Sequence, residues 1–376
     1  MQKKTVLFLV NHDVVIYNFR LELVERLIAD GHKVHVSSPY GERIEDLVKL
    51  GAIYHEIKIA RHGTNPVTDG VLIWNYIKLL KQVKPNIVFS YTIKPNIYGG
   101  IACRLMNVPQ VANVTGLGTA VENPGLTQKI TLALYRFAFK KIQRIFFQNT
   151  ENRQFFIDNN LFTDKHGLLP GSGVNLERFA PLPYPDETDG IHFVFISRIM
   201  REKGIEQYLD AAAHFKKCHP EQSASGVEGS KIHFHICGFC ESEYQGKLEE
   251  YAKNGIVIYH GMVRDVREVL KKIHCTIHPS FYPEGISNIL LESCACTRPI
   301  ITTDRSGCRE VVNDGVNGFV VKQRDSEDLI QKIEKFLALT HEQKMQMGLA
   351  GRAKVEHEFD RQVVVNAYLK EMECEQ

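Results

Sequence analysis

Short runs of apolar and β-branched residues alternate with amphipathic stretches along the whole chain. In the first half the amphipathic stretches 19–29 and 71–83 predict helices, and the same alternation begins again at residue 191. Repeated strand–helix–strand units build parallel sheets. The pattern therefore predicts an α/β protein with two doubly wound parallel sheets. The predicted strands are 5–10, 33–37, 86–90, 110–114, 144–148, 191–196, 231–237, 256–259, 275–279 and 299–302.

A proline-rich segment, 181–186, separates the two halves and is typical of a linker. A chain of 376 residues also favours two domains over one. We expect a first domain over 1–180, a second over 181–358 and a terminal helical segment over 359–376. The polar stretch 219–230 predicts a surface insertion.

The most informative motif is E-G-I-S-N-I-L-L-E, in which Glu284 and Glu292 stand eight positions apart across a turn that opens a helix. Eight helical residues rise about 12 Å, which is roughly the distance between the sugar and the ribose of a sugar nucleotide. Each carboxylate can accept hydrogen bonds from ligand hydroxyls. The N–H groups of Gly285, Ile286 and Ser287, with the helix dipole, would bind a diphosphate between them. Alone, the motif equally describes a loop acid and an exposed helix glutamate.

A basic turn follows the predicted strand 191–196, where Arg198 and Lys203 bracket the entry to the next helix. Ligands of open α/β sheets bind at the carboxyl ends of strands. One guanidinium and one ammonium match the two charges of a diphosphate. Taken alone, the turn is also compatible with a solvated basic loop.

Together, R-x4-K-G at 198–204, the paired glutamates and G-S-G-V-N at 171–175 resemble the retaining glycosyltransferases of family 4, which have the GT-B architecture. The resemblance covers nearly the whole chain. It implies two Rossmann-like domains that face a cleft, the first binding the acceptor and the second the nucleotide sugar. It also implies a terminal helix that crosses back to the first domain.

The resemblance implies a role for each motif residue. Glu292 would bind the ribose hydroxyls and Glu284 the hydroxyls of the donor sugar. Arg198 and Lys203 would neutralise the diphosphate and stabilise its departure. The backbone of the turn 261–265 would read the base. The donor-binding positions are Glu292, Gly285, Ile286, Ser287, Gly238 and Val263.

The family's reaction is thought to proceed on one face of the sugar, with the leaving phosphate taking the acceptor's proton. This implies no carboxylate nucleophile, no metal and no cofactor besides the UDP-sugar substrate. The chain has no D-x-D motif for a metal, and no G-x-G-x-x-G follows its first strand, which argues against an NAD-linked dehydrogenase. The alternative, a double displacement, would use Glu284 as its nucleophile.

The N-terminal half differs from better-known members because its loops at 91–96 and 113–119 carry no histidine. The motifs Y-N-F-R at 17–20 and T-G-L-G at 115–118 look most like capsular and lipid-linked oligosaccharide transferases, including the type that adds N-acetylgalactosamine to an undecaprenyl-diphosphate sugar. For Arg20 and Lys94 the alternative is an ordinary surface charge or a helix-capping charge. The acceptor-binding candidates are Arg20, Lys94, His12 and Thr115.

The net charge of +2 hides an asymmetry. Residues 1–180 carry 22 Lys and Arg against 14 Asp and Glu, a net of +8, and the remainder has a net of −6. The basic residues form no nucleic-acid motif, so an anionic membrane is the expected partner. The stretch 129–141 mixes cationic and apolar residues, as an interfacial helix does, although a core-facing helix with a basic edge has the same pattern. With no signal peptide or membrane-spanning segment, we expect a cytoplasmic protein on the inner membrane face.

Nine cysteines, an odd number, predict reduced thiols. Cys237 and Cys240 form a C-x2-C motif near His233 and His235, which is compatible with a zinc or redox site. Because His233, His235 and Cys237 alternate along an apolar run, a core strand explains them better.

These residues predict transfer of a hexose or N-acetylhexosamine from a UDP-sugar to a lipid-diphosphate-linked sugar in surface polysaccharide or glycan synthesis. The alternatives are an isomerase like UDP-N-acetylglucosamine 2-epimerase and a noncatalytic nucleotide-sugar-binding subunit. The combination of R-x4-K-G with the paired glutamates favours transfer over both.

Overall fold

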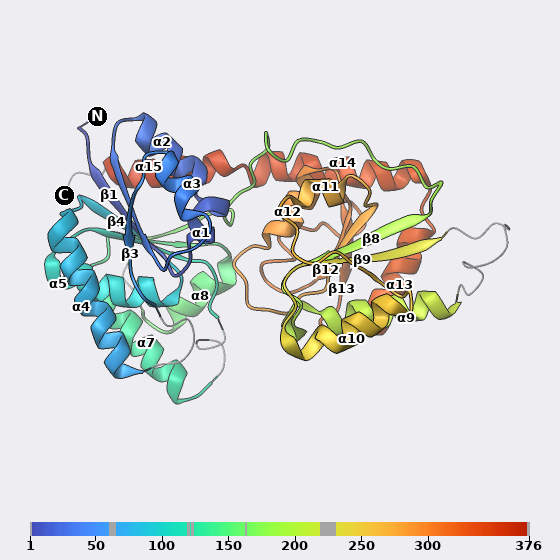
Figure 1. Ribbon diagram of the computed structural model, residues 1–376, viewed down its shortest axis with the longest axis horizontal. Coiled ribbons are helices and arrows are strands. Elements are labelled where there is room, and N and C mark those ends of the chain that lie inside the picture. Colours follow the sequence, from blue (N-terminus) through green and yellow to red (C-terminus); the bar gives the residue numbers. More distant parts are fainter. Residues whose placement is uncertain are drawn as a thin grey trace. The chain divides into compact units, whose positions relative to one another are not determined.

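The computed structural model describes residues 2–59, 65–118, 121, 124–161, 164–218 and 231–373. The chain forms two compact units, each with a parallel sheet covered by helices on both faces (Figure 1). The predicted insertion 219–230 lies outside the described residues. None of the described helices combines the length and the apolar character that crossing a membrane requires.

The units are discontinuous in sequence. Unit 1 contains Met1–Gly173, Pro283–Gly285 and Arg361–Gln376, and unit 2 contains Val174–Tyr282 and Ile286–Asp360. The expected division at 180/181 therefore falls several residues too late. The reason is local, because the Val174 N–H donates to the Phe359 carbonyl (2.8 Å) and Val174 is buried in a core of unit 2.

The sheet of unit 1 has seven parallel strands in the order β3-β2-β1-β4-β5-β6-β7. Its five central strands match the predicted runs, because strands buried on both faces are continuously apolar. The edge strands β3 and β7 were not predicted; they are short and partly exposed. The strands are β1 Thr5–Leu9, β2 Lys33–Ser38, β3 Ile53–Glu56, β4 Ile87–Tyr91, β5 Gln110–Val114, β6 Arg144–Phe147 and β7 His166–Leu168.

Helices cover both faces of this sheet. One core packs α4 (Pro66–Val83), α5 (Gly100–Met106), α7 (Leu126–Ala138) and α8 (Thr150–Asp158) against it. The core on the other face includes α1 (Asp13–Phe19), α2 (Leu21–Ala29), α3 (Ile44–Lys49) and α15 (Arg361–Glu373). Two short helices, η1 (Pro95–Gly99) and η2 (Phe139–Lys141), flank α5 and α7.

The sheet of unit 2 has six parallel strands in the order β10-β9-β8-β11-β12-β13. They are β8 Ile191–Ile196, β9 Ile232–Cys237, β10 Ile258–Tyr259, β11 Cys275–His278, β12 Ile300–Thr303 and β13 Gly318–Val321. The helices are η3 Arg201–Lys203, α9 Ile205–Cys218, α10 Ser242–Lys253, α11 Val266–Leu270, α12 Asn288–Ala295, α13 Ser326–Leu337 and α14 His341–Glu358. The prediction of two doubly wound parallel sheets is confirmed.

The cysteines of the described segments are free thiols, and six of them are buried. Cys237 lies in β9 with its side chain in the core, where burial raises the pKa of the thiol to about 12. Within the described part of the chain no three His, Cys, Asp or Glu side chains are arranged to hold a metal ion. The core-strand interpretation of the C-x2-C motif agrees with this placement.

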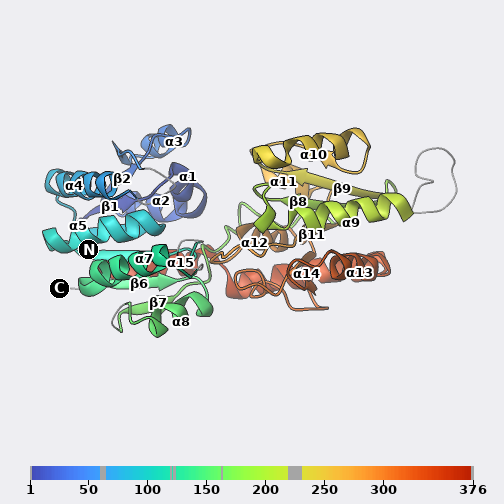
Figure 2. The ribbon, with the colours of Figure 1, turned by 90° about the horizontal axis from the view of Figure 1, so that it is seen from below.

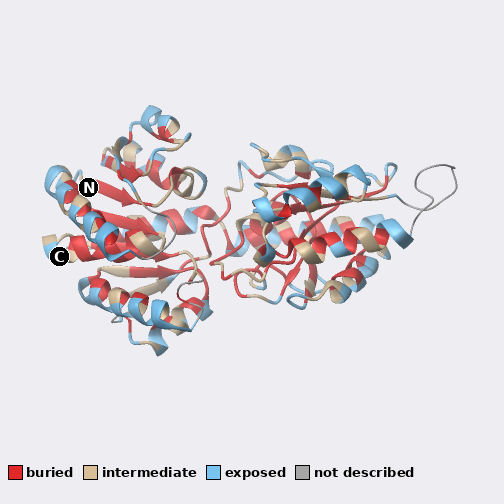
Figure 3. Ribbon diagram, turned by 60° about the horizontal axis from the view of Figure 1, so that its bottom comes forward, coloured by how far each residue is buried: buried red, intermediate tan, exposed pale blue. Residues whose placement is uncertain are grey.

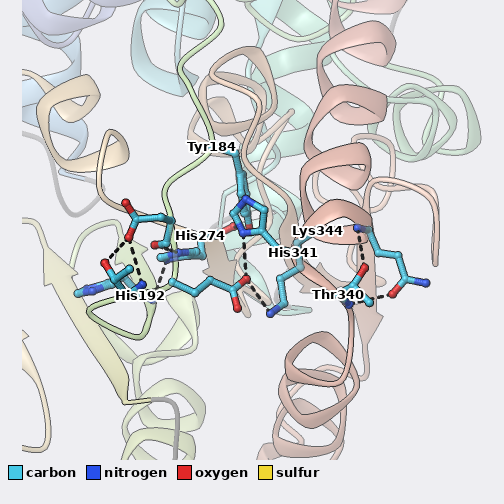
Figure 4. A network of polar contacts seen from close by, with 10 residues as sticks. Tyr184, His192, His274, Thr340, His341 and Lys344 are labelled. Carbon is cyan, nitrogen blue, oxygen red and sulfur yellow. Dashed lines mark hydrogen bonds and ion pairs between the residues drawn. The ribbon is translucent and has the colours of Figure 1, made fainter.

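Polar contacts hold the proline-rich segment against the second sheet (Figure 4). The Tyr184 hydroxyl donates to the His274 carbonyl (2.9 Å), and Glu187 accepts from the buried Lys344 ammonium (3.1 Å). The His274 ring accepts the His192 N–H at Nδ1 (3.0 Å), so its proton is on Nε2, which faces the Asp186 carbonyl (3.0 Å). The predicted linker is thus a structural part of unit 2.

A chain of imidazoles crosses one face of the same sheet. His192 Nδ1 lies 2.9 Å from His235 Nε2, and His235 Nδ1 lies 2.9 Å from His260 Nε2. Burial and the neighbouring imidazoles lower the pKa of His192 to about 4 and that of His235 to about 3. Each N···N contact needs one N–H donor and one acceptor nitrogen. Neutral imidazoles supply both, so the hydrogen bonds between these rings form when the rings are neutral.

The imidazole chain should make unit 2 sensitive to acid. Between the ordinary histidine pKa of 6.5 and about pH 3 the unfolded chain binds more protons than the folded one. The contribution of these histidines to the free energy of unfolding is therefore fully present above pH 6.5, and it is lost as the pH falls through this window. Thermal unfolding from pH 7.5 to 4.5 should show a steeper loss of Tm for the parent than for His235→Gln. His214→Gln, which changes a histidine outside the chain, should keep the parent slope; equal slopes for all three would contradict the assignment.

Candidate functional site

The basic motif forms the turn between β8 and α9. Residues Arg201–Lys203 make a short 3-10 helix that ends at Gly204, whose φ is +79°. A Cβ at this glycine would lie 2.1 Å from the Pro279 carbonyl oxygen, just beyond β11. Only glycine therefore fits the end of the R-x4-K-G motif, and this close approach fixes the turn at the carboxyl edge of the sheet.

Arg198 and Lys203 converge on one aromatic ring. The Arg198 guanidinium lies 5.5 Å from the centre of the Tyr282 ring, and the Lys203 ammonium lies 4.8 Å from it. Lys203 is 8% exposed, whereas Arg198 is exposed. The sequence predicted the two cations but missed Tyr282, although it stands two residues before Glu284. The ring holds both charges by cation–π attraction.

Two further glycines bring neighbouring turns together. Gly238 follows β9 with φ +138°, and a Cβ there would lie 1.8 Å from the Ser197 carbonyl oxygen. The Gly238 N–H donates to the Gly261 carbonyl (2.8 Å). The predicted donor positions Gly238 and Val263 thus belong to turns beside Arg198, at the edge where parallel sheets bind ligands.

The predicted anion site at the start of α12 differs in one respect. The Ser287 N–H donates to the Gly307 carbonyl (2.7 Å), and Ile286 and Ser287 are buried. Helix α12 begins at Asn288, so its unsatisfied N–H groups are those of residues 288–290. In this structure the Ser287 amide is not available to a diphosphate. Glu292 lies on the same helix and is half-buried.

The segment that carries Glu284 is fixed within unit 1. The Asn149 side-chain amide donates to the carbonyls of Glu284 (3.1 Å) and Gly285 (2.7 Å). A Cβ at Gly285 would lie 2.0 Å from Gln148 Oε1 and 2.6 Å from the Thr115 carbonyl oxygen. The sequence predicted Thr115 but missed Gln148 and Asn149. Their polar side chains directly follow a buried strand, which was the signal that could have found them.

Arg20 is buried between aromatic rings. Its guanidinium lies 5.0 Å from the centre of Tyr91 and 5.6 Å from that of Tyr368, and Nη1 donates to the Phe19 carbonyl (2.5 Å). It also separates α1 from α2, where a single helix over 19–29 was expected. With 2% of its surface exposed, Arg20 supports the fold, which argues against direct contact with an acceptor.

Lys94 and His12 also have internal partners. The Lys94 ammonium pairs with Asp69 (3.1 Å), which accepts a second hydrogen bond from the Tyr98 hydroxyl (2.7 Å). Lys94 lines a cavity of about 1070 Å³ beside β2, β3 and α4, together with Lys58 and Lys78. His12 caps α1 by accepting the Val14 N–H (3.2 Å). Lys94 is thus an acceptor candidate that lines a cavity.

The chain matches two family models. Residues 5–149 match the model described as glycosyl transferase 4-like, and residues 183–354 match glycosyl transferases group 1. Together the matches span most of the chain. The chain is a glycosyltransferase whose first half is a glycosyl transferase 4-like domain and whose second half is a group 1 domain. The resemblance to family 4 stated from the motifs is confirmed.

Individual relatives of this glycosyltransferase act on lipid-linked sugars. It is 25% identical, over 96% of both chains, to the N,N'-diacetylbacillosaminyl-diphospho-undecaprenol alpha-1,3-N-acetylgalactosaminyltransferase of Campylobacter jejuni. It is 26% identical to the UDP-Gal:alpha-D-GlcNAc-diphosphoundecaprenol alpha-1,3-galactosyltransferase of Escherichia coli, over 68% of this chain and 67% of the relative.

Solved structures share the fold. A glycosyltransferase from Rickettsia africae superposes with a TM-score of 0.79 at 18% identity over 98% of each chain. An Anabaena protein in complex with UDP and glucose superposes with a TM-score of 0.78 at 16% identity, over 98% of this chain and 99% of that one. The GT-B fold expected from the motifs is confirmed.

The Tyr282 ring should matter for turnover more than its hydroxyl. Tyr282→Phe keeps the ring and should retain transfer within about twofold, whereas Tyr282→Ala should lower kcat about 10-fold, because both cations lose a shared contact. Steady-state kinetics and thermal unfolding of both variants measure this. Equal kcat for the two variants, or a loss of Tyr282→Ala activity explained wholly by unfolding, would contradict the positioning role.

Proposed function

We propose that this glycosyltransferase transfers a hexose or N-acetylhexosamine, with retention of configuration, from a UDP-sugar to a sugar carried on a lipid diphosphate. The observation that carries the proposal is the convergence of Arg198 and Lys203 at the carboxyl end of β8. The acceptors named for the Campylobacter jejuni and Escherichia coli relatives support the choice of acceptor class. The product would enter surface polysaccharide or glycan synthesis.

In the proposed reaction an acceptor hydroxyl attacks the anomeric carbon while the bond to the β-phosphate oxygen breaks. The leaving diphosphate takes the hydroxyl proton, and negative charge develops on its oxygens. The Arg198 guanidinium can make forked contacts with these oxygens, and the buried Lys203 ammonium adds a charge of low hydration. Both act most strongly where the charge develops, so they lower the barrier more than they strengthen ground-state binding.

The two motif glutamates have different proposed roles. Glu292 binds the ribose hydroxyls, a contact made equally in the ground and transition states. Glu284 binds hydroxyls of the transferred sugar. Because the acceptor hydroxyl attacks the anomeric carbon directly, Glu284 does not act as a nucleophile. The proposed transfer uses no metal and no further cofactor.

The acceptor's lipid confines the proposed reaction to the cytoplasmic surface of a membrane. We extend the proposal to a peripheral attachment of the protein there. The net charge of +8 in residues 1–180 supports it, because each basic residue near an anionic surface contributes about 1 kcal/mol.

Substitution of the two glutamates should separate binding from turnover. Glu292→Ala should weaken UDP binding and raise KM, and Glu284→Gln should chiefly lower kcat. The measurements are UDP titration and transfer to undecaprenyl-diphosphate-linked sugars across a panel of UDP-sugars. Incubation with UDP-N-acetylglucosamine alone is the control. A new UDP-sugar there would indicate an epimerase, and binding without turnover on any acceptor would indicate a noncatalytic subunit.

Loss of either cation should slow transfer without a metal being able to restore it. Arg198→Ala and Lys203→Ala should each lower kcat about 100- to 1,000-fold, the usual cost of one transition-state donor. The parent should keep its full rate after treatment with EDTA. Inactivation by EDTA that Mg²⁺ or Mn²⁺ reverses would contradict the metal-free mechanism.

A further inference from the structure

The positive charge of unit 1 is concentrated in one helical layer. Helices α4, α5 and α7, with η1 and η2, cover the same face of the first sheet (Figures 1 and 2). Asp69 is the sole acidic residue of these five helices, and it is buried against Lys94 and Tyr98. The seven basic residues of the layer are Lys78, Lys81, Arg104, Lys129, Arg136, Lys140 and Lys141.

The layer on the opposite face has the opposite charge. Helices α1, α2, α3 and α15 together contain seven acidic and four basic residues. The five helices of the basic layer contain seven basic residues and one acidic residue. Helix α8 packs on the same face as the basic layer and adds Glu151, Arg153 and Asp158, which makes eight basic and three acidic residues on that face. The charge of unit 1 therefore still separates across its sheet.

The outer surface of the basic layer is also apolar. Along α7, Leu126, Ile130 and Phe137 follow helical spacing and are exposed, while Tyr135 and Ala138 are buried. Figure 3 shows the general pattern, in which the strands are mostly buried and the helices carry both buried and exposed residues. Lys129, Arg136 and Lys140 are exposed among these apolar residues. Helix α7 thus has a core-facing side and an outward face that is itself amphipathic, which combines the two interpretations of this sequence.

Helix α4 repeats the arrangement. Val67, Val71 and Trp74 are exposed at helical spacing, and Trp74 is 55% exposed. The Lys78 ammonium lies 5.6 Å from the Trp74 ring, and the Arg104 guanidinium lies 4.0 Å from the Phe137 ring. Aromatic and aliphatic groups mixed with cations are the side chains of an interfacial helix. Exposed apolar residues that gather along one face of a helix, in contrast to single scattered ones, indicate an interaction site.

We propose that the outer surface of α4, α5 and α7 docks on an anionic lipid bilayer. The apolar side chains would enter the headgroup region, and the cations would neutralise lipid phosphates. The clustered aliphatic side chains at the centre of the charge favour a bilayer over nucleic acid, whose backbone offers them no apolar partner. The inference deepens the proposed function by naming the surface that faces the membrane. The reason for docking rests on the proposed lipid-linked acceptor, whereas the surface itself is inferred from charge and exposure.

The chain has a built-in reporter for this docking. Trp74 is its one tryptophan and lies on the proposed surface. Vesicles of phosphatidylcholine with phosphatidylglycerol should shift its emission to the blue and bring the protein down in co-sedimentation. Vesicles of phosphatidylcholine alone should do neither at the same lipid concentration. High salt should weaken the attachment, because ions screen the attraction between exposed basic residues and lipid phosphates.

Paired variants test the charged and apolar parts separately. Lys129→Glu with Lys140→Glu should weaken partition to anionic vesicles at least 30-fold, since each basic residue is worth about fivefold. The matched control, Lys49→Glu with Lys253→Glu, makes the same change in net charge at exposed positions elsewhere and should bind like the parent. Leu126→Ser with Ile130→Ser should reduce the binding that remains at high salt, whereas Val316→Ser with Leu349→Ser should not.

Because these experiments use lipid without any sugar, they are independent of transfer. A normal lipid response in a protein that transfers no sugar would overturn the proposed function and keep the docking surface. The docking surface is overturned if both charge variants bind vesicles equally. It is also overturned if Trp74 emission does not respond to lipid, if Trp74 is covered by a second copy in solution, or if duplex DNA binds and vesicles do not.

Discussion

The second sheet depends on backbone approaches that leave no room for a side chain. At Gly204 and at Gly238 a single added carbon would collide with a carbonyl oxygen of a neighbouring turn. These contacts hold the turns after β8 and β9 beside each other and beside the end of β11. The cations at positions 198 and 203 can share one ring only because the peptide groups beneath them are that close. The site proposed at this edge therefore depends on two positions at which a residue without a Cβ is required.

The sequence predicted the features that obey a simple period and missed those that depend on context. The central strands could be predicted because burial on both faces leaves an uninterrupted apolar run. The edge strands β3 and β7 could not, because three or four half-exposed residues carry no such pattern. The break in the helix at Arg20 was missed as well, because the sequence has a helical pattern on both sides of this residue. The break accompanies the packing of the Arg20 guanidinium between two tyrosine rings, which the pattern does not indicate.

The candidate site was predictable to the same extent. Motif spacing predicted Arg198 and Lys203 on one turn and Glu292 on a helix, and the structure places them there, because strand and helix geometry define these positions. Tyr282 and Asn149 were missed, since their importance comes from contacts with residues far along the chain. The Ser287 amide was assigned to a ligand because helix starts generally leave amides unsatisfied. The partner that occupies it, the Gly307 carbonyl, lies twenty residues later and no local rule indicates it.

The discontinuity of unit 1 has a consequence for biosynthesis. One of its cores is completed by Val364, Val365, Tyr368 and Met372 of α15, and the Tyr368 hydroxyl accepts a hydrogen bond from Asn113 in β5. During synthesis on the ribosome the first sheet emerges about 190 residues before these partners do. The nascent first unit must therefore persist with an open apolar face until the last helix arrives. Unit 2, whose residues form a nearly continuous block, can complete its core first, so the order of folding along this chain need not follow the order of translation.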